Sequence, residues 1–519
     1  MNIIFFTQSG SLDVFYQIFL RIKKKLDVKK VGFYVSNKKH YEKFLIEHSN
    51  FEKQFTILKE WKIYSEAKGH KPDFNRISKY EQEIGDPTLW TPIVTDRRLY
   101  LGKKITFHQD YKPFYTYDQQ MSIIDIALKN IDNFISDINP DLICTIYTAT
   151  FGDCLGHQFA QARRIRSLDL RLSRLKNYVM FVNGVKEPPP HIEYILKNND
   201  DSILQDKKKE AEDYVEEVLK KNLMYEGVLD SARINNKNEK SSGKSNGIFS
   251  KGIRFIRNNF DTSYRDDPQN PDFLQSYIYK KFINPYISKR INNTLKDSLV
   301  DEAFIISNRY VLYPLHTEPE LVLSQFARPY LNQIEVIRNI SLSIPVGKFV
   351  LVKEHPMMFG RRTVSFYKKI LQIPNVRLVK FDLPSESVLK NAELVVVLRG
   401  AIGLEAVIKK IPVVSLGRSM FELLPINMFR FCNSLYDLPQ EISDILTNYK
   451  YNHKALLNYL SAVMEGSVQV NLIGDLLGKK GRHRSELVES SFDKHPHFDI
   501  LANHMLKRIQ ESGNLQGIV

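Results

Sequence analysis

A series of short apolar runs, each ending in polar or small residues, dominates residues 311–417 of this chain. The runs are rich in β-branched residues and lack the alternation of apolar and polar positions that marks a half-exposed strand. They are typical of parallel strands that helices bury on both faces. Helical patterns separate the runs, for instance at residues 332–343. Strands that alternate with helices in this way predict an open α/β sheet.

The residues that directly follow these strands mark the expected ligand-binding edge. In open α/β sheets, ligands bind at the carboxyl ends of the strands. The residues that we expect at this edge are His316, Glu318, Glu320, Lys353, His355, Arg399, Gly400 and Gly403. Together they predict half of a binding site for an anionic ligand.

The length and charge of the chain limit its organisation and its partners. At 519 residues it is too long for one ordinary core, so we expect two domains. The 74 Lys and Arg residues exceed the 59 Asp and Glu residues by 15, which favours an anionic partner such as a nucleotide, a nucleic acid or an anionic membrane surface. The positive charge is spread along the chain and no nucleic-acid motif is visible, so nucleic-acid binding is not expected.

The cysteine count and the apolar runs predict a cytoplasmic protein. Three cysteines give no disulfide framework, which suits a reducing compartment. Residues 1–6 have the pattern of a core strand rather than of a signal peptide. No apolar run approaches the roughly 20 residues that span a bilayer. Any work on lipid-linked material would therefore take place at the inner face of the membrane.

The first 184 residues predict a second α/β unit with its own polar edge. Apolar runs at residues 2–6, 30–35, 140–147 and 177–182 predict strands, and residues 121–136 predict an amphipathic helix. The segment around Glu83 and Asp96 carries a Gly-Asp-Pro turn and an adjacent Asp-Arg pair. A carboxylate here would act as a base or nucleophile, and the alternative is an ion pair that fixes a loop.

Residues 148–157 follow one of these strands and open a helix. Asp153 and His157 lie four positions apart and so share a helix face. Two interpretations are open: a lining of the acceptor site, which we prefer, and a metal pair. No third metal ligand is indicated by the spacing.

The remaining segments predict a connector and a closing unit. Residues 235–247 are rich in Gly, Ser and Lys, as in a linker, and residues 252–257 are short, basic and apolar. The latter would either contact an anionic membrane or form a solvated helix end. We expect four parts: an acceptor-side domain at 1–184, a helical connector at 185–300, a nucleotide-binding domain at 301–440 and closing helices at 441–519.

Two motifs in the second half of the chain predict a phosphate site. Residues 353–356 (KEHP) place Lys353 and His355 where they would hold a phosphate by charge-assisted hydrogen bonds, and Arg361 adds positive charge. The alternative for this His-Pro pair is a capped strand end. Residues 399–405 (RGAIGLE) follow another strand, so backbone N–H groups at Gly400 and Gly403 would face a phosphate.

Carboxylates beside these motifs predict contacts to sugar hydroxyls. Glu405 lies where it would accept from a ribose, and Glu318 and Glu320 would receive a sugar hydroxyl or shape the cleft. A metal site made of His316 with these two glutamates is an alternative. Because no known metal-binding spacing is matched, we expect a reaction that needs neither metal nor cofactor.

At these residues the chain resembles a known family. The motifs at residues 313–320, 353–356 and 400–406, with those at 83–90 and 96–97, look like the capsular polysaccharide biosynthesis proteins, which are similar to bacterial Kdo transferases. The resemblance implies a GT-B fold, with two Rossmann-like domains facing a central cleft. It implies donor binding by His355 and the turn at 400–405, and catalysis by Glu83, Asp96 or Asp153. Relatives tend to have Ser or Thr around the Gly turn where this chain has Arg399 and Ala401, so Arg399 would replace hydroxyl contacts to phosphate.

The function implied is a glycosyltransferase of capsule or lipopolysaccharide synthesis. Its donor would be a nucleotide-sugar, with CMP-linked sugars among the candidates, and its acceptor a polysaccharide or a glycolipid. Two rivals remain open: a CDP-alditol phosphotransferase of the teichoic-acid type, and a non-catalytic scaffold of a capsule-assembly complex.

Overall fold

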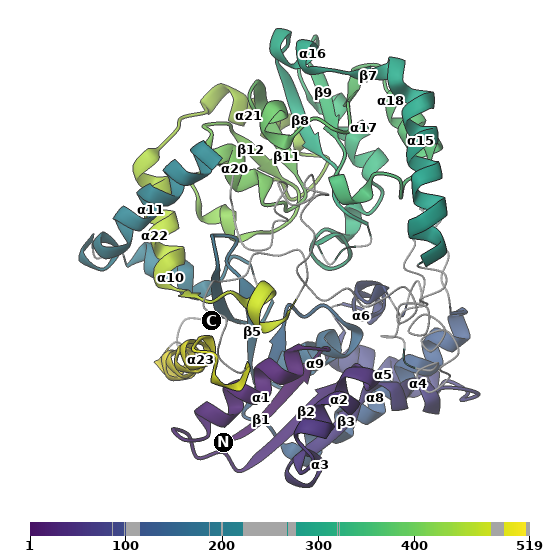
Figure 1. Cartoon of the computed structure of the whole chain (residues 1–519), viewed down its shortest axis with the longest axis vertical. Coiled ribbons are helices and arrows are strands. Elements are labelled where there is room, and N and C mark those ends of the chain that lie inside the picture. The colour runs from purple at the N-terminus through teal and green to yellow at the C-terminus, as the bar shows by residue number, and fades with distance from the viewer. Residues whose placement is uncertain are drawn as a thin grey trace, which may run out of the picture.

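Two seven-stranded sheets organise the chain, and Figure 1 shows them one above the other. The computed structural model describes residues 1–85, 87–97, 99, 115–185, 187–198, 201–221, 267, 277–318, 320, 322–478 and 492–514. The expected α/β architecture with two Rossmann-like domains is confirmed.

The N-terminal sheet is mostly parallel and has the order β14-β6-β5-β4-β1-β2-β3. Only β6 runs in the opposite direction, antiparallel to both of its neighbours, β5 and β14. The strands are β1 (Asn2–Thr7), β2 (Lys30–Val35), β3 (Thr56–Lys59), β4 (Leu142–Ile146), β5 (Arg166–Leu172), β6 (Tyr178–Asn183) and β14 (Val468–Gln469). The sequence predicted four of these strands, and β3, β5 and β14 were missed.

Helices cover both faces of this sheet, because central strands such as β1 are apolar on both sides. Ile3 and Phe5 of β1 belong to one core with α1, whereas Ile4 and Phe6 belong to a second core with α8. The helices are α1 (Ser11–Ile22), α2 (Lys38–Glu47), α3 (Phe51–Gln54), α4 (Glu60–Glu66), α5 (Phe74–Ile84), α6 (Trp90–Thr95), α8 (Tyr117–Ile138), α9 (Phe151–Ala162) and α23 (His497–Asn514).

The C-terminal sheet is parallel throughout and has the order β13-β12-β11-β8-β9-β10-β7. Its strands are β7 (Leu299–Val300), β8 (Tyr310–Pro314), β9 (Phe349–Lys353), β10 (Val376–Val379), β11 (Ala392–Val397), β12 (Val413–Ser415) and β13 (Phe429–Phe431). Its helices are α16 (Glu302–Ser307), α17 (Gln333–Ser343), α18 (Val364–Leu371), α19 (Ser385–Leu389), α20 (Ile402–Ile408) and α21 (Leu438–Asn448). Strands β8, β9 and β11 meet in the middle and bring their carboxyl ends together.

Four helices link the two sheets or lie along their side. On the left of Figure 1, α10 (Pro190–Lys197) and α11 (Asp201–Lys221) lie beside α22 (His453–Glu465), and their buried side chains join one apolar core with β6, β8 and β11. The chain then returns to the first sheet through β14, and α23 packs against α1. On the right, a π-helical turn, η2 (Tyr279–Ile283), continues into α15 (Asn284–Leu295).

Two of the segments predicted from the sequence lie outside the residues that the structure describes. They are the expected linker at 235–247 and the basic segment at 252–257. Among the helices that the structure describes, none has both the length and the apolar character needed to cross a membrane.

Candidate functional site

Two histidines and a glycine meet at the carboxyl edge of the C-terminal sheet. His316 follows β8, His355 follows β9 and Gly400 follows β11. The Leu398 N–H donates to Nε2 of His316 at 3.3 Å. A Cβ at Gly400 would lie 3.2 Å from Cε1 of this ring, so glycine permits the close approach. The structure therefore gathers three of the residues that the sequence assigned to donor binding.

His355 is a neutral donor rather than a cation. Burial, with the charges of Arg362, Lys353 and Arg361, lowers its pKa to about 4. The Met357 N–H donates to Nδ1 at 3.2 Å, so the neutral ring carries its proton on Nε2. The expected positive charge on His355 is thus absent near pH 7. The ring instead offers one N–H donor at Nε2 and carries no charge.

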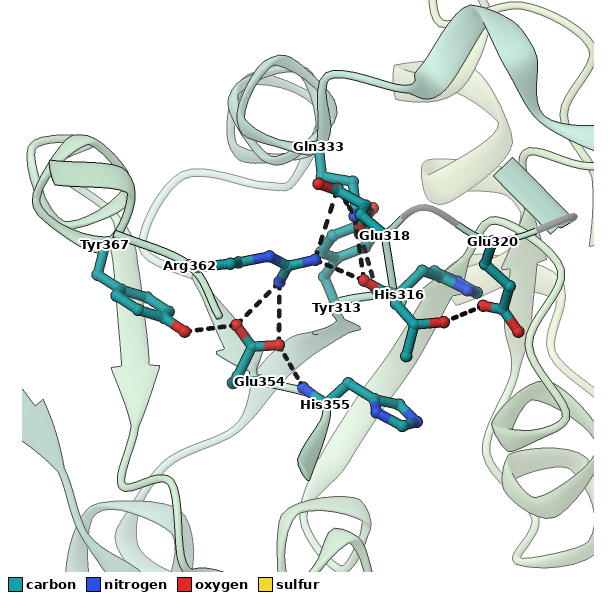
Figure 2. Close-up of polar contacts among 10 residues, drawn as sticks. Tyr313, His316, Glu318, Glu320, Gln333, Glu354, His355, Arg362 and Tyr367 are labelled. Carbon is teal, nitrogen blue, oxygen red and sulfur yellow. Dashed lines mark hydrogen bonds and ion pairs between the residues drawn. The ribbon is translucent and has the colours of Figure 1, made fainter. Parts of the chain in front are cut away.

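A buried arginine supports both histidines. Figure 2 shows Arg362 between two carboxylates, with the His355 ring pointing away from it. Arg362 donates from Nη1 to both carboxylate oxygens of Glu354, at 2.9 and 2.8 Å, and from Nη2 to the carbonyl oxygen of His316 at 2.5 Å. The Tyr367 hydroxyl donates to Glu354 at 2.7 Å. Because Glu354 also accepts the His355 N–H, one buried ion pair positions the ends of β8 and β9.

Other predicted residues lie at this edge with different partners. Glu318 is buried 3.5 Å from Arg362 and accepts from Gln333, so it faces inward. Lys353 donates to the Phe381 carbonyl oxygen at 3.0 Å, and burial lowers its pKa. Glu320 accepts from the Thr317 hydroxyl. His316, Glu318 and Glu320 do not gather as metal ligands among the described residues.

Arg361 is the available cation beside His355. Among the described residues its guanidinium makes no hydrogen bond or ion pair, and its charge contributes to the lowered pKa of His355. It differs in this from Arg362, whose charge is neutralised internally.

The residues after β11 contribute to packing as well as to the edge. A Cβ at Gly403 would contact Phe429, Val397 and Val413, so this glycine faces the sheet. Glu405 is buried and pairs with Lys409 at 3.4 Å. Burial raises the pKa of Glu405, and its charge in turn contributes to the raised pKa of Tyr214 on α11. The expected ribose contact would have to compete with these partners.

Arg399 bridges the two sheets instead of facing a free cleft. Its Nη2 binds the carboxylate of Glu187, which lies in the loop after β6. The guanidinium carbon of Arg399 lies 3.4 Å from the centre of the Phe326 ring. Glu187 also accepts from Nη1 of Arg171 at 2.9 Å, and Arg171 binds Asp169. Arg399 remains a cation, although burial lowers its pKa to about 10.

Asp153 is the buried acid of the opposite edge. It lies in the first turn of α9, where Oδ2 accepts from the Thr150 N–H at 3.2 Å and from Gln8. Its Oδ1 has no hydrogen-bond partner among the described residues. Burial raises its pKa from 3.8 to about 7. A carboxylate with this pKa can take up or release a proton near neutral pH.

Of the other predicted carboxylates, Asp96 joins Asp153 and Glu83 does not. Asp96 is buried and accepts the Phe151 N–H at 3.1 Å, also at the start of α9. Glu83 pairs with Arg163 at 2.9 Å, beyond the other end of α9. Arg163 lies ten positions after Asp153, which is ~15 Å along the helix axis at ~1.5 Å per residue. Glu83 thus forms an ion pair away from the other two carboxylates.

The buried partners of these groups could not be recognised from the motifs in the sequence. Glu187, Arg171, Asp169, Glu354 and Gln333 were not singled out. The signal that would have found them is charge inside apolar strand patterns, as in residues 166–172 (RSLDLRL), since buried charges need partners.

The C-terminal sheet matches a known family. Residues 268–427 match the model of the capsule polysaccharide biosynthesis protein family, and this stretch contains His316, His355 and Gly400. Residues 1–267 lie outside the match. In a comparison with curated proteins, none matched the chain at a significant level.

Solved structures with some likeness include sugar transferases and epimerases. A β-Kdo 2,7 transferase, KpsC of Thermosulfurimonas dismutans, is 10% identical over 73% of this chain and 89% of that chain, with a TM-score of 0.33. A β-Kdo 2,4 transferase of the same protein is 12% identical over 65% and 88%, with a TM-score of 0.33. A UDP-GlcNAc 2-epimerase from Neisseria meningitidis is 10% identical over 98% and 100%, with a TM-score of 0.26. The family model that matches residues 268–427 confirms the resemblance to the capsule polysaccharide biosynthesis protein family over that part of the chain.

Proposed function

We propose that this protein is a glycosyltransferase of capsule polysaccharide synthesis that takes its sugar from a nucleotide-sugar. The proposal rests on the ion pair between Glu187 and Arg399, which joins two sheets whose edges carry different chemical groups. One edge offers a neutral N–H donor at His355 and a cation at Arg361. The other holds Asp153, an acid with a pKa of about 7.

The donor would bind at the edge formed by β8, β9 and β11. The Nε2–H of His355 would donate to a phosphate oxygen, and Arg361 would balance its charge. When the bond between the sugar and the phosphate breaks, negative charge develops on the leaving nucleotide. Donors already fixed at that point stabilise this charge without reorganisation. The family match covers this edge, which supports the assignment.

Asp153 would act on the acceptor. As a base it would take the proton of the acceptor hydroxyl while the hydroxyl oxygen forms the new bond to the sugar carbon. As a nucleophile it would form that bond itself before the acceptor displaces it. Asp153 is preferred over Asp96 because an unpartnered buried oxygen and a raised pKa both suit proton transfer.

We propose further that the protein contacts an anionic membrane through η2 and α15. Ile278, Phe282 and Tyr286 are exposed at intervals of four residues, and Lys281 and Lys289 lie exposed beside them. No acidic residue occurs between positions 277 and 296. Apolar side chains flanked by basic ones suit the interface of an anionic bilayer. Such a contact would place the protein at the inner face of the membrane, where a lipid-linked acceptor would be found.

A thermal-shift screen tests the catalytic proposal. The purified chain is heated with CMP, CDP, UDP, GDP, their sugar conjugates and a CDP-alditol, because a ligand that binds the folded state raises Tm. We expect one nucleotide series to stabilise the wild type and not His355→Ala. Stabilisation by a CDP-alditol alone would assign the alditol phosphotransferase instead. A response to none of them would favour the scaffold.

A further inference from the structure

Two histidines and an aspartate gather near the end of the chain, outside the proposed transfer site. Asp475 lies in the π-helical turn η8 (Leu472–Leu476), and His495 and His497 lie between η9 (Phe492–Lys494) and the first turn of α23. One ligand atom from each lies within 4.8 Å of the others. Among the described residues this is the one such group of three His, Cys, Asp or Glu side chains.

The two imidazoles are buried with unpartnered nitrogens. His495 is 6% exposed and His497 8%, and the Asp475 side chain is 2% exposed. Nε2 of His495 and Nδ1 of His497 have no hydrogen-bond partner among the described residues. Nε2 of His495 lies 3.8 Å from Oδ2 of Asp475, too far for a hydrogen bond. Buried polar atoms normally have partners, so the two unpartnered imidazole nitrogens point to a ligand that binds beside Asp475.

We propose that Asp475, His495 and His497 hold one divalent transition-metal ion of the zinc type. Neutral imidazole and carboxylate are the ligands that Zn²⁺ prefers beside thiolate, whereas Mg²⁺ and Ca²⁺ take oxygen ligands. Two ligand atoms each ~2.1 Å from a tetrahedral ion lie ~3.4 Å apart. The 3.8 Å between His495 and Asp475 is close to this separation.

One local bond has to give way when the ion binds. The His497 N–H donates to Nδ1 of His495 at 3.3 Å, which in the neutral ring leaves the proton on Nε2. When a metal binds Nε2, the proton of the ring moves to Nδ1. A protonated Nδ1 cannot accept from the His497 N–H, so this long hydrogen bond is lost and the metal bond takes its place.

The ion would join the end of the chain to its beginning. Gln17 of α1 donates to Asp493 of η9 at 2.7 Å, and Arg21 pairs with Asp499 of α23 at 2.8 Å. The three ligands therefore come from segments that pack on the first helix of the N-terminal domain. We assign the ion a structural part in holding η8, η9 and α23 against α1. This inference is independent of the proposed transferase activity.

Metal binding to the intact chain tests the proposal. The full-length protein is stripped with a chelator, dialysed and titrated with Zn²⁺, and then with Co²⁺, whose visible spectrum reports the ligand geometry. We expect one equivalent of Zn²⁺ per chain and a higher Tm after loading. Asp475→Asn and His497→Gln are nearly isosteric and should each weaken Zn²⁺ binding by more than about tenfold. His453→Gln, on an exposed histidine of α22, should leave the binding unchanged.

The proposal is overturned if the wild type binds no zinc stoichiometrically, or if both ligand variants bind it as the wild type does. Because the wild type is measured directly, a variant that fails to fold does not decide the test. Nucleotide stabilisation, measured on the same samples, separates failure of the metal site from failure of the transferase proposal.

Discussion

The carboxylate of Glu187 binds the guanidinium of Arg399, and this ion pair joins the loop after β6 to the end of β11. The two side chains are only 6% and 11% exposed, so solvent and salt screen the pair little. Arg171 shares the same carboxylate and also binds Asp169, so Arg399 depends on Glu187 more than Arg171 does. The contact between the two sheets at this point is therefore electrostatic and sensitive to the loss of Glu187.

Removing the charge of Glu187 should weaken the fold. In Glu187→Gln, Arg171 and Arg399 lose their shared anion while buried, and breaking a buried pair in this way costs about 3–5 kcal/mol. The free energy of unfolding, measured in urea, checks this. Glu335→Gln is the matched control, because Glu335 pairs with Arg338 on the surface, where such a pair contributes less than about 1 kcal/mol. Equal effects of the two substitutions would contradict a buried interdomain pair.

Asp153→Asn should abolish transfer and stabilise the protein at neutral pH. The folded-state pKa is raised from 3.8 to about 7, so between these values the folded state holds a proton that the unfolded state has lost. Wild-type stability contributed by this group is therefore present below pH 4 and declines as the pH rises to 7. The advantage of the variant in urea unfolding should grow over this window. If Asp153 acts as a base, wild-type turnover should rise with pH through about 7, and a flat profile would count against that role.

Two substitutions of His355 should show whether its N–H donor is what binds the nucleotide. His355→Ala removes the N–H donor and should weaken nucleotide binding by about 10- to 100-fold, as for a bond of 1.5–3 kcal/mol to a charged group. His355→Gln restores an N–H donor on a side chain of similar reach and should recover part of the affinity. Isothermal titration with the nucleotide found in the screen measures both. A glutamine variant as weak as the alanine variant would show that the imidazole acts in another way.

Substitutions of Arg362 and Glu354 should have coupled effects on the free energy of unfolding. Arg362→Met leaves Glu354 buried without its cation and should cost about 3–5 kcal/mol of folding free energy. The double variant with Glu354→Gln should be more stable than the sum of the two single effects predicts, because neither charge is then left alone. Urea unfolding of the four proteins gives the coupling energy. A coupling near zero would mean that other groups hold the ends of β8 and β9.

The exposed face of η2 and α15 should bind anionic vesicles. Sedimentation with phosphatidylglycerol vesicles should carry down the wild type, and vesicles of neutral lipid should not. Phe282→Ser with Tyr286→Ser should abolish this binding while activity on a water-soluble acceptor is kept. Tyr436→Ser, which removes an aromatic side chain exposed elsewhere on the C-terminal domain, is the control. Undiminished sedimentation of the double variant would place the membrane contact on another surface.

Strands such as β8, β9 and β11 could be predicted because their environment is uniform. Strands β8, β9 and β11 are buried on both faces, so nearly every position except Lys353 and Glu393 is apolar, and the pattern needs no knowledge of a partner. Strand β5 was missed for the opposite reason. It carries Asp169 and Arg171 in a buried setting, and these residues are tolerated only because Thr145 and Glu187 pair with them from other segments.

The candidate site could likewise be predicted only in part from the sequence. The sequence by itself determined which strand ends carry polar residues, and since parallel strands share one edge, this determined that His316, His355 and Gly400 would meet. Only the tertiary structure decided that His355 is neutral, that Arg362 is internally balanced while Arg361 is not, and that Arg399 binds Glu187. The charge state and partner of a polar group depend on burial and on contacts between residues far apart in sequence, and no local pattern of residues records these.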